Sequence, residues 1–284
     1  MGRQLDLSAR TVLITGAAGG LGSALAQALR ERGAYLALLD LDADALAAQA
    51  DALGGADVAR GWAADVTDLA YLERVMAEVR AHFGGIDVAV AGAGVLGPVK
   101  TMTATSAAEW DRVIDINLGG VWRALRAAAP HVAARQGHLV ALSSLIAYVH
   151  PPLLGGYAAS KAAVAALCDV LRLELRPAGV TVGSVHPAIF RTPLIAGGLD
   201  SPAAVALVRD FTGVFRTVEL DAVVADVVRA IEHRSARLTV PRAHRATPFA
   251  AGAVQAVVER LAFRPRTVRR AIALGSITTA TESR

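Results

Sequence analysis

The stretch Thr11–Gly22, TVLITGAAGGLG, decides the fold. Its first five residues form an unbroken, mostly apolar run, which is typical of a strand covered on both faces. A glycine-rich turn follows, and the Ala/Leu-rich run Leu21–Arg32 has the length of a helix. Glycines let the backbone approach a pyrophosphate closely, and the helix N-terminus offers free N–H groups and the positive end of its dipole. The stretch therefore predicts a dinucleotide-binding βα unit; the alternative is an ordinary strand-to-helix turn.

The same alternation of short apolar runs and longer helical patterns continues along the chain. Besides Thr11–Thr15, the expected strands are Tyr35–Asp40, Ile86–Ala91, His138–Ser143, Val180–His186 and Arg237–Val240. Besides Leu21–Arg32, the expected helices are Ala43–Leu53, Leu69–Phe83, Ala107–Ala129, Tyr157–Arg176 and Leu220–Glu232. Ser106 and Glu109 have the capping-box spacing at a helix start. This order predicts an α/β fold, a doubly wound parallel sheet with helices on both faces.

The pattern breaks after Pro187. Residues 188–218 carry several prolines and glycines among many apolar side chains, so we expect a long functional loop with short helices. Residues 1–240, this loop included, are predicted to form one domain. Residues 241–284 are predicted to be a basic extension with a helix at Ala250–Phe263.

Composition limits the classes of protein that the chain can belong to. Of its 284 residues, 54% are hydrophobic and 19% are charged, which excludes general disorder. No segment approaches 18 clean apolar residues and the start lacks an apolar run, so neither a membrane span nor a secretory signal is expected. The single Cys168 excludes an internal disulfide framework and favours a reducing, cytoplasmic location. No metal site is predicted.

The net charge of +4 is unevenly spread, because residues 234–284 carry ten arginines against Glu259 and Glu282. Val254, Val257, Val258 and Leu261 share one side of the expected helix in this extension. A basic amphipathic segment can lie on an anionic membrane surface. The favoured alternative is a helix docked on its own subunit or on a neighbouring one, with solvated arginines. Nucleic acid is not expected as a partner, since no recognised reading motif accompanies the charge.

Asp40 ends the second expected strand, 18 residues after Gly22, close to the spacing of a ribose-binding carboxylate. A carboxylate accepts hydrogen bonds from a ribose 2′-hydroxyl but repels a 2′-phosphate. Neither Gly19 nor Leu41 supplies a cation for such a phosphate. NAD is therefore favoured over NADP; the alternative is that Asp40 caps the next helix, although Asp42 is better placed to do so.

A second constellation lies at Tyr157 and Lys161, which are four residues apart and so share one helix face. A nearby ammonium favours the phenolate, so we expect Lys161 to lower the pKa of Tyr157 and fit it for proton exchange. Lys100 is the only other lysine of the chain. Ser144 comes 13 residues before Tyr157, at the carboxyl end of a predicted strand, where ligands bind in open α/β sheets.

Together these motifs resemble the short-chain dehydrogenase/reductase family, over about residues 8–240. The glycine motif is matched by Thr15, Gly16, Gly20, Leu21 and Gly22, and the adenine-contacting Asp–Val after the third strand is matched by Asp65 and Val66. The active-site Asn, Ser, Tyr and Lys are matched by Asn117, Ser144, Tyr157 and Lys161. Pro187, Ile189 and Thr192 resemble the segment that touches the nicotinamide carboxamide.

The family's Asn-Asn-Ala-Gly after the fourth strand reads Ala91-Gly92-Ala93-Gly94 here. Ala91 lacks the side chain that braces the sheet, whereas cofactor contact through the backbone of Ala91 and Gly92 could survive. His186 precedes Pro187, where Asn is frequent in the family, and we interpret it as a strand-end residue.

The resemblance implies a role for each matched residue. Tyr157 exchanges a proton with the substrate oxygen, and Ser144 donates a hydrogen bond to that oxygen. Lys161 binds the nicotinamide ribose, and Asn117 holds a water that links Lys161 to solvent. The resemblance also implies a homodimer or homotetramer that pairs through the two long helices Ala107–Ala129 and Tyr157–Arg176.

The resulting hypothesis is NAD-dependent interconversion of a secondary alcohol and a ketone. The apolar loop 188–218, Leu145, Ile146, Tyr148 and the Leu153-Leu154 pair favour a hydrophobic substrate, such as a steroid, terpenoid, lipid-derived or aromatic alcohol. Two alternatives stay open. One is an NADPH-dependent reductase of 3-oxoacyl thioesters or other carbonyls, and the other is a non-catalytic dinucleotide sensor.

Overall fold

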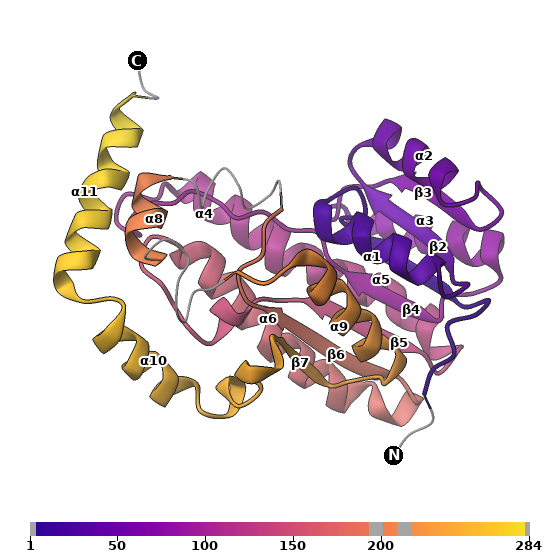
Figure 1. The fold of residues 1–284 in the computed structure, drawn as a ribbon. Helices are drawn as coiled ribbons and strands as arrows, with labels where there is room; N and C mark the ends of the chain where they lie inside the picture. The colour runs from indigo at the N-terminus through magenta and orange to yellow at the C-terminus, as the bar shows by residue number, and fades with distance from the viewer. Residues whose placement is uncertain (1–3, 193–200, 209–216, 282–284) are drawn as a thin grey trace.

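The computed structural model describes residues 4–192, 201–208 and 217–281. Its core is a seven-stranded parallel sheet in the order β3-β2-β1-β4-β5-β6-β7 (Figure 1). The strands are β1 Thr11–Thr15, β2 Tyr35–Asp40, β3 Ala59–Ala63, β4 Val88–Ala91, β5 His138–Leu142, β6 Thr181–Pro187 and β7 Arg237–Val240. The strand order reverses beside β1, so the carboxyl ends of β1 and β4 diverge there and open a crevice for a ligand. This architecture confirms the predicted doubly wound α/β fold.

The helices cover both faces of the sheet. They are α1 Gly20–Arg30, α2 Ala43–Ala52, α3 Leu69–Phe83, α4 Ala107–Ile114, α5 Val121–Ala133, α6 Gly155–Glu174, α8 Pro202–Val208, α9 Leu220–Glu232, α10 Ala251–Leu261 and α11 Pro265–Thr281. Successive residues of a strand point to opposite faces. Val12 and Ile14 of β1 accordingly pack on the side of α1 and α9, whereas Leu13 packs on the side of α3, α5 and α6. Burial on both sides explains why the strands are apolar runs without alternation.

Two elements were not predicted from the apolar pattern. β3 reads ARGWA, with Ala59 and Trp62 buried and Arg60 exposed, because it is the edge strand of the sheet. α11 lies in the Arg-rich extension, where the pattern predicted no second helix. Its residue Ala271 is fully buried in a small core with Leu207 of α8 and Val258 of α10. Tertiary packing therefore stabilises a helix whose own apolar periodicity is weak.

The expected helix over Ala107–Ala129 extends to Ala133 and contains a π-helical segment, Asp115–Gly120. Its start is confirmed, since Ser106 and Glu109 form a complete capping box. In the expected loop 188–218, α8 is the described helix, and residues 193–200 and 209–216 lie outside the described part of the chain. α8, α10 and α11 gather at one end of the molecule, far from the β3 edge (Figure 1).

Candidate functional site

A cavity of about 810 Å³ lies at the carboxyl ends of the strands. This volume falls in the range of small-molecule and cofactor sites. It is lined by 15 of the residues singled out from the sequence, namely Thr15, Gly16, Gly20, Leu21, Gly22, Asp40, Asp65, Val66, Gly92, Ser144, Tyr157, Lys161, Pro187, Ile189 and Thr192. Asn117 and Ala91 do not line it. Ala91 is buried inside the sheet's core, and Asn117 lies behind the cavity wall.

The glycine-rich turn at the end of β1 is built for close approach. Gly16 has a φ of +73°, and a Cβ there would lie 2.9 Å from the Cα of Ala93. A Cβ at Gly22 would collide with the carbonyl of Gly16. The Thr15 hydroxyl accepts hydrogen bonds from the backbone N–H groups of Gly92 (3.0 Å) and Ala93 (3.2 Å). The turn and the end of β4 are therefore held together along the cavity.

Asp40 stands at the end of β2 with its carboxylate at the cavity. Oδ2 accepts a hydrogen bond from the Ala18 N–H in the glycine-rich turn (3.0 Å), and Oδ1 accepts one from the Leu41 N–H (2.8 Å). Asp42, not Asp40, caps α2, because its side chain accepts a hydrogen bond from the Ala45 N–H. Asp40 is thus left to fix the turn and to present acceptor oxygens to a ligand. The glycines, the open turn and this carboxylate fit a dinucleotide.

Ser144, Tyr157 and Lys161 converge on the same cavity from β5 and α6. The Lys161 Nζ donates to the Leu142 carbonyl (2.9 Å) and lies 5.6 Å from the centroid of the Tyr157 ring. The Ser144 hydroxyl donates to the Pro187 carbonyl (3.4 Å) and accepts from the Ile146 N–H (3.2 Å). These contacts tie the ends of β5 and β6 to the start of α6. A phenol, a hydroxyl and an ammonium thus face one space.

The expectation that Lys161 lowers the pKa of Tyr157 is wrong for the chain by itself. Burial raises the pKa of Tyr157 to about 12, although a hydrogen bond with Ser144 acts to lower it. Burial likewise lowers the pKa of Lys161 to about 8. Both shifts have the same cause, because a low-dielectric site penalises the charged form of each group. The phenol is therefore a protonated donor at neutral pH.

Asn117 sits in the π-helical segment and is fully buried. Its Oδ1 accepts from the Val95 N–H (2.7 Å), and its Nδ2 donates to the Val95 carbonyl (2.8 Å) and to the Ser160 hydroxyl (3.2 Å). A Cβ added at Gly94 would lie 3.1 Å from Asn117 Oδ1 and 3.6 Å from Lys161 Nζ. Asn117 and Lys161 therefore flank Gly94. The asparagine braces the loop after β4 from a position beside Lys161.

Away from the glycine-rich turn, the cavity wall is mostly apolar. Of the residues expected there from the sequence, Leu145, Ile146 and Leu154 line the cavity, whereas Tyr148 and Leu153 do not. Leu153 is buried in the core shared with α8 and α10. Further apolar lining comes from Val149, Phe190, Ala204 and Leu207.

The extension also contributes to this wall, which the sequence did not reveal. His244, Thr247 and Val254 line the cavity together with the strand-end residues. The only sequence signal was the amphipathic pattern that includes Val254. That pattern predicts a packed helix but not the surface on which the helix packs.

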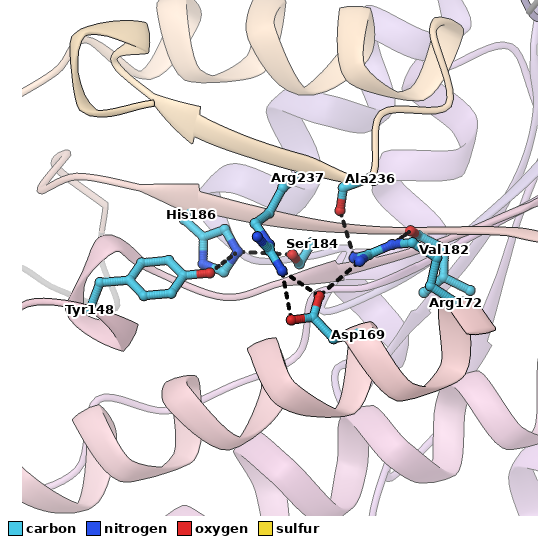
Figure 2. A network of polar contacts seen from close by, with 8 residues as sticks. All are labelled: Tyr148, Asp169, Arg172, Val182, Ser184, His186, Ala236 and Arg237. Carbon is cyan, nitrogen blue, oxygen red and sulfur yellow. Dashed lines mark hydrogen bonds and ion pairs between the residues drawn. The ribbon is translucent and has the colours of Figure 1, made fainter. Parts of the chain in front are cut away.

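Tyr148 does not line the cavity, and its hydroxyl belongs to a polar network with His186 and Ser184 (Figure 2). Its hydroxyl lies 3.3 Å from Nε2 of His186, which is also 2.9 Å from the Ser184 hydroxyl. The other ring nitrogen, Nδ1, faces the Ser144 carbonyl at 3.3 Å. A carbonyl only accepts, so Nδ1 carries the proton and Nε2 accepts. His186 is thus a buried, neutral residue at the end of β6, and it does not line the cavity.

Two features are absent from the described residues. No group of three or more His, Cys, Asp or Glu side chains there is arranged to hold a metal ion. No helix there is long and apolar enough to cross a membrane.

A family model described as short chain dehydrogenase matches residues 10–199. The chain belongs to this family. Its members are oxidoreductases, and the doubly wound parallel sheet is the fold of its solved members.

Similar proteins with curated names act on quite different molecules. The D-threitol dehydrogenase of Mycolicibacterium smegmatis is 36% identical over 71% of this chain and 78% of that protein. A 3-alpha-(or 20-beta)-hydroxysteroid dehydrogenase of Mycobacterium tuberculosis is 33% identical over 66% of this chain and 72% of that protein. The chain also matches 16% of the glycine betaine reductase ATRR of Emericella nidulans at 36% identity, and so corresponds to only part of that protein.

Among solved structures, a short-chain dehydrogenase/reductase of Burkholderia phymatum in complex with NAD is similar, with a TM-score of 0.77 and 25% identity. The match covers 89% of this chain and 96% of that one.

Proposed function

We propose that this short-chain dehydrogenase interconverts a secondary alcohol and a ketone with NAD(H). One observation carries the proposal: Ser144, Tyr157 and Lys161 line the same cavity as the glycine-rich turn and Asp40. A nicotinamide dinucleotide, when bound, supplies the hydride or accepts it. The chain then has to orient the substrate and move one proton.

Tyr157 is the residue that moves this proton. In the direction of ketone reduction, its phenol donates its proton to the substrate oxygen as a C–H bond forms at the carbonyl carbon. The Ser144 hydroxyl can donate to the same oxygen and stabilise the charge that develops on it. For this donation, Ser144 exchanges its hydrogen bond to the Pro187 carbonyl for one to the substrate.

Lys161 and Asn117 support that transfer. A charged Lys161 stabilises the phenolate that remains on Tyr157 after transfer. It would also bind the ribose next to the nicotinamide. We expect Asn117, which flanks Gly94 together with Lys161, to hold a water in the proton path. The carboxamide of the nicotinamide would contact Pro187, Ile189 and Thr192.

Asp40 supports NAD in preference to NADP. Its carboxylate accepts hydrogen bonds from the backbone N–H groups of Ala18 and Leu41 and would repel a 2′-phosphate. The NAD complex of the Burkholderia phymatum relative is consistent with this choice. Asp65, Val66 and the backbone of Ala91 and Gly92 would complete the adenosine side of the site.

The apolar wall supports a hydrophobic substrate of the steroid, terpenoid, lipid-derived or aromatic type. The hydroxysteroid dehydrogenase relative agrees with this, whereas the D-threitol dehydrogenase relative represents the polar alternative. Asp40 counts against an NADPH-dependent 3-oxoacyl-thioester reductase. The complete Ser144, Tyr157 and Lys161 set counts against a dinucleotide sensor, which would need only the glycine-rich turn and Asp40.

We further propose that residues 1–240 form the dehydrogenase domain, that residues 241–284 form its extension, and that the enzyme is a homodimer or homotetramer. Trp122 on α5 and Val170 and Leu173 on α6 are large exposed hydrophobic residues on the two helices expected to pair. The single buried Cys168 fits a reducing, cytoplasmic location.

A panel of alcohols and ketones with NAD(H) and NADP(H), followed at the absorbance of the reduced nicotinamide, tests the proposal. We expect turnover of an apolar secondary alcohol or ketone with NAD(H) at a higher kcat/KM than with NADP(H). Higher kcat/KM with NADP(H) would contradict the cofactor assignment. Activity only on small polar alcohols would contradict the substrate class.

A further inference from the structure

The extension helix α10 carries one apolar stripe that is only partly covered. Val258 and Ala262 are buried against α8 and α11, and Val254 reaches the cavity. Val257 and Leu261 lie on the adjoining flank of the same stripe and are each 54% exposed. An amphipathic helix normally buries its apolar stripe against a partner. On α10 the flank with Val257 and Leu261 stays half exposed.

Phe249 is a third exposed apolar residue of the extension. It lies in the short turn Thr247–Phe249 just before α10 and is 81% exposed, the largest value among the exposed large hydrophobic residues. Single exposed hydrophobic residues are common on protein surfaces. Here three of them fall within 13 residues, so we define Phe249, Val257 and Leu261 as the outer apolar strip.

The charge around this strip is predominantly positive. Between residues 241 and 281 the chain has seven arginines, and Glu259 is the only acidic residue. Arg260 and Arg264 follow Val257 and Leu261 by three residues each, and three more exposed arginines lie on α11, at positions 266, 269 and 270. Within the described residues, none of these five arginines forms an ion pair with a carboxylate.

We propose that the outer apolar strip and these arginines bind the surface of an anionic phospholipid membrane. The apolar side chains would enter the boundary between headgroups and acyl chains, and the arginines would contact the anionic headgroups. The contact is peripheral, in keeping with the absence of a membrane-spanning helix among the described residues.

A second copy of the chain fits this surface less well. A twofold interface brings the same patch of both copies together, so the arginines of one copy would face those of the other. An anionic membrane supplies both an apolar layer and opposite charge. Val254 of α10 lines the cavity, so membrane binding would place the cavity wall next to a reservoir of apolar molecules. The binding itself does not depend on the proposed function.

The test is co-sedimentation of the full-length protein with vesicles of phosphatidylcholine, with and without phosphatidylglycerol. We expect binding only to the vesicles with phosphatidylglycerol, weakened by added salt because the Debye length shortens. Equal sedimentation with both vesicle types, or none with either, would overturn the proposal.

Two double variants locate the surface. Val257→Gln with Leu261→Gln removes apolar area without changing charge, and Arg264→Gln with Arg266→Gln removes charge. Each is expected to weaken binding at least about tenfold. Met102→Gln and Arg74→Gln are matched controls elsewhere on the surface and should bind as wild type. Tryptophan-fluorescence titration with NADH checks that each variant is folded.

Light scattering without lipid tests whether a second copy of the chain, and not a membrane, covers this surface. If the double variants bind vesicles as wild type but form smaller oligomers, the strip belongs to a contact between copies and the membrane proposal is wrong. If oligomer size is unchanged and vesicle binding is lost, the proposal stands, whatever the substrate panel shows.

Discussion

Asp40 performs two tasks with one carboxylate. It accepts a hydrogen bond from the Ala18 N–H of the glycine-rich turn and also presents acceptor oxygens to the cavity. Its role at the cavity was predictable from the sequence, because an acidic residue that follows a glycine motif at this spacing ends the next strand. Its hydrogen bond to the turn was not predictable, because it depends on how the two strand ends meet.

The first prediction concerns Asp40→Ser. The affinity for NADH should fall about tenfold to a hundredfold, since a hydrogen bond to a charged group contributes about 1.5–3 kcal/mol. The affinity for NADPH should rise, because the carboxylate no longer repels the 2′-phosphate. Fluorescence titration with both nucleotides measures this, with Asp44→Ser on α2 as the control. Unchanged NADH binding would show that Asp40 does not contact the ribose.

At the scale of elements, the π-helical segment Asp115–Gly120 decides how Asn117 is used. Asn117 lies in this segment, is fully buried, and pairs with the backbone of Val95 and with Ser160. π-Helical turns occur frequently at functional sites. The sequence indicated a helix here but not the π-turn, because apolar periodicity does not record a one-residue insertion.

The second prediction is that Asn117→Leu destabilises the protein. The substitution leaves the partly buried N–H and C=O groups of Val95 without their partners, at a cost of up to about 1–3 kcal/mol for each. The melting temperature should fall clearly, whereas that of the exposed-site control Asp111→Asn on α4 should not change. A melting temperature equal to wild type would mean that other groups satisfy Val95.

Other elements show what apolar periodicity can and cannot predict. β1 and β2 were predicted with their observed bounds because they are buried on both faces, and the pattern of such strands is unmistakable. The edge strand β3 and the helix α11 were missed. Each is stabilised by a neighbour, and that neighbour is remote in the sequence.

At the scale of the whole molecule, two buried histidines link stability to pH. Burial lowers the pKa of both His138 and His186 to about 4. The unfolded chain therefore takes up protons below about pH 6.5 that the folded chain does not bind. The stabilisation is complete above about pH 6.5 and is lost as the pH falls toward 4.

The third prediction follows from the downward direction of these two pKa shifts. The free energy of unfolding should fall by up to about 1.4 kcal/mol per pH unit for each histidine between pH 6.5 and 4. Urea denaturation at a series of pH values measures the slope. His186→Gln should reduce the slope, and the exposed-site control His150→Gln should not. A stability that does not change over this range would show that the two rings are protonated in the fold.

The central claim is that Tyr157 transfers the proton in a cavity that binds NAD(H). Its most direct test is Tyr157→Phe, assayed on the best substrate pair from the panel, with NADH affinity measured in parallel. Loss of general acid–base catalysis should lower kcat by about 10²–10⁴-fold, whereas the dissociation constant for NADH should change little. A Tyr157→Phe enzyme with wild-type kcat would contradict the claim.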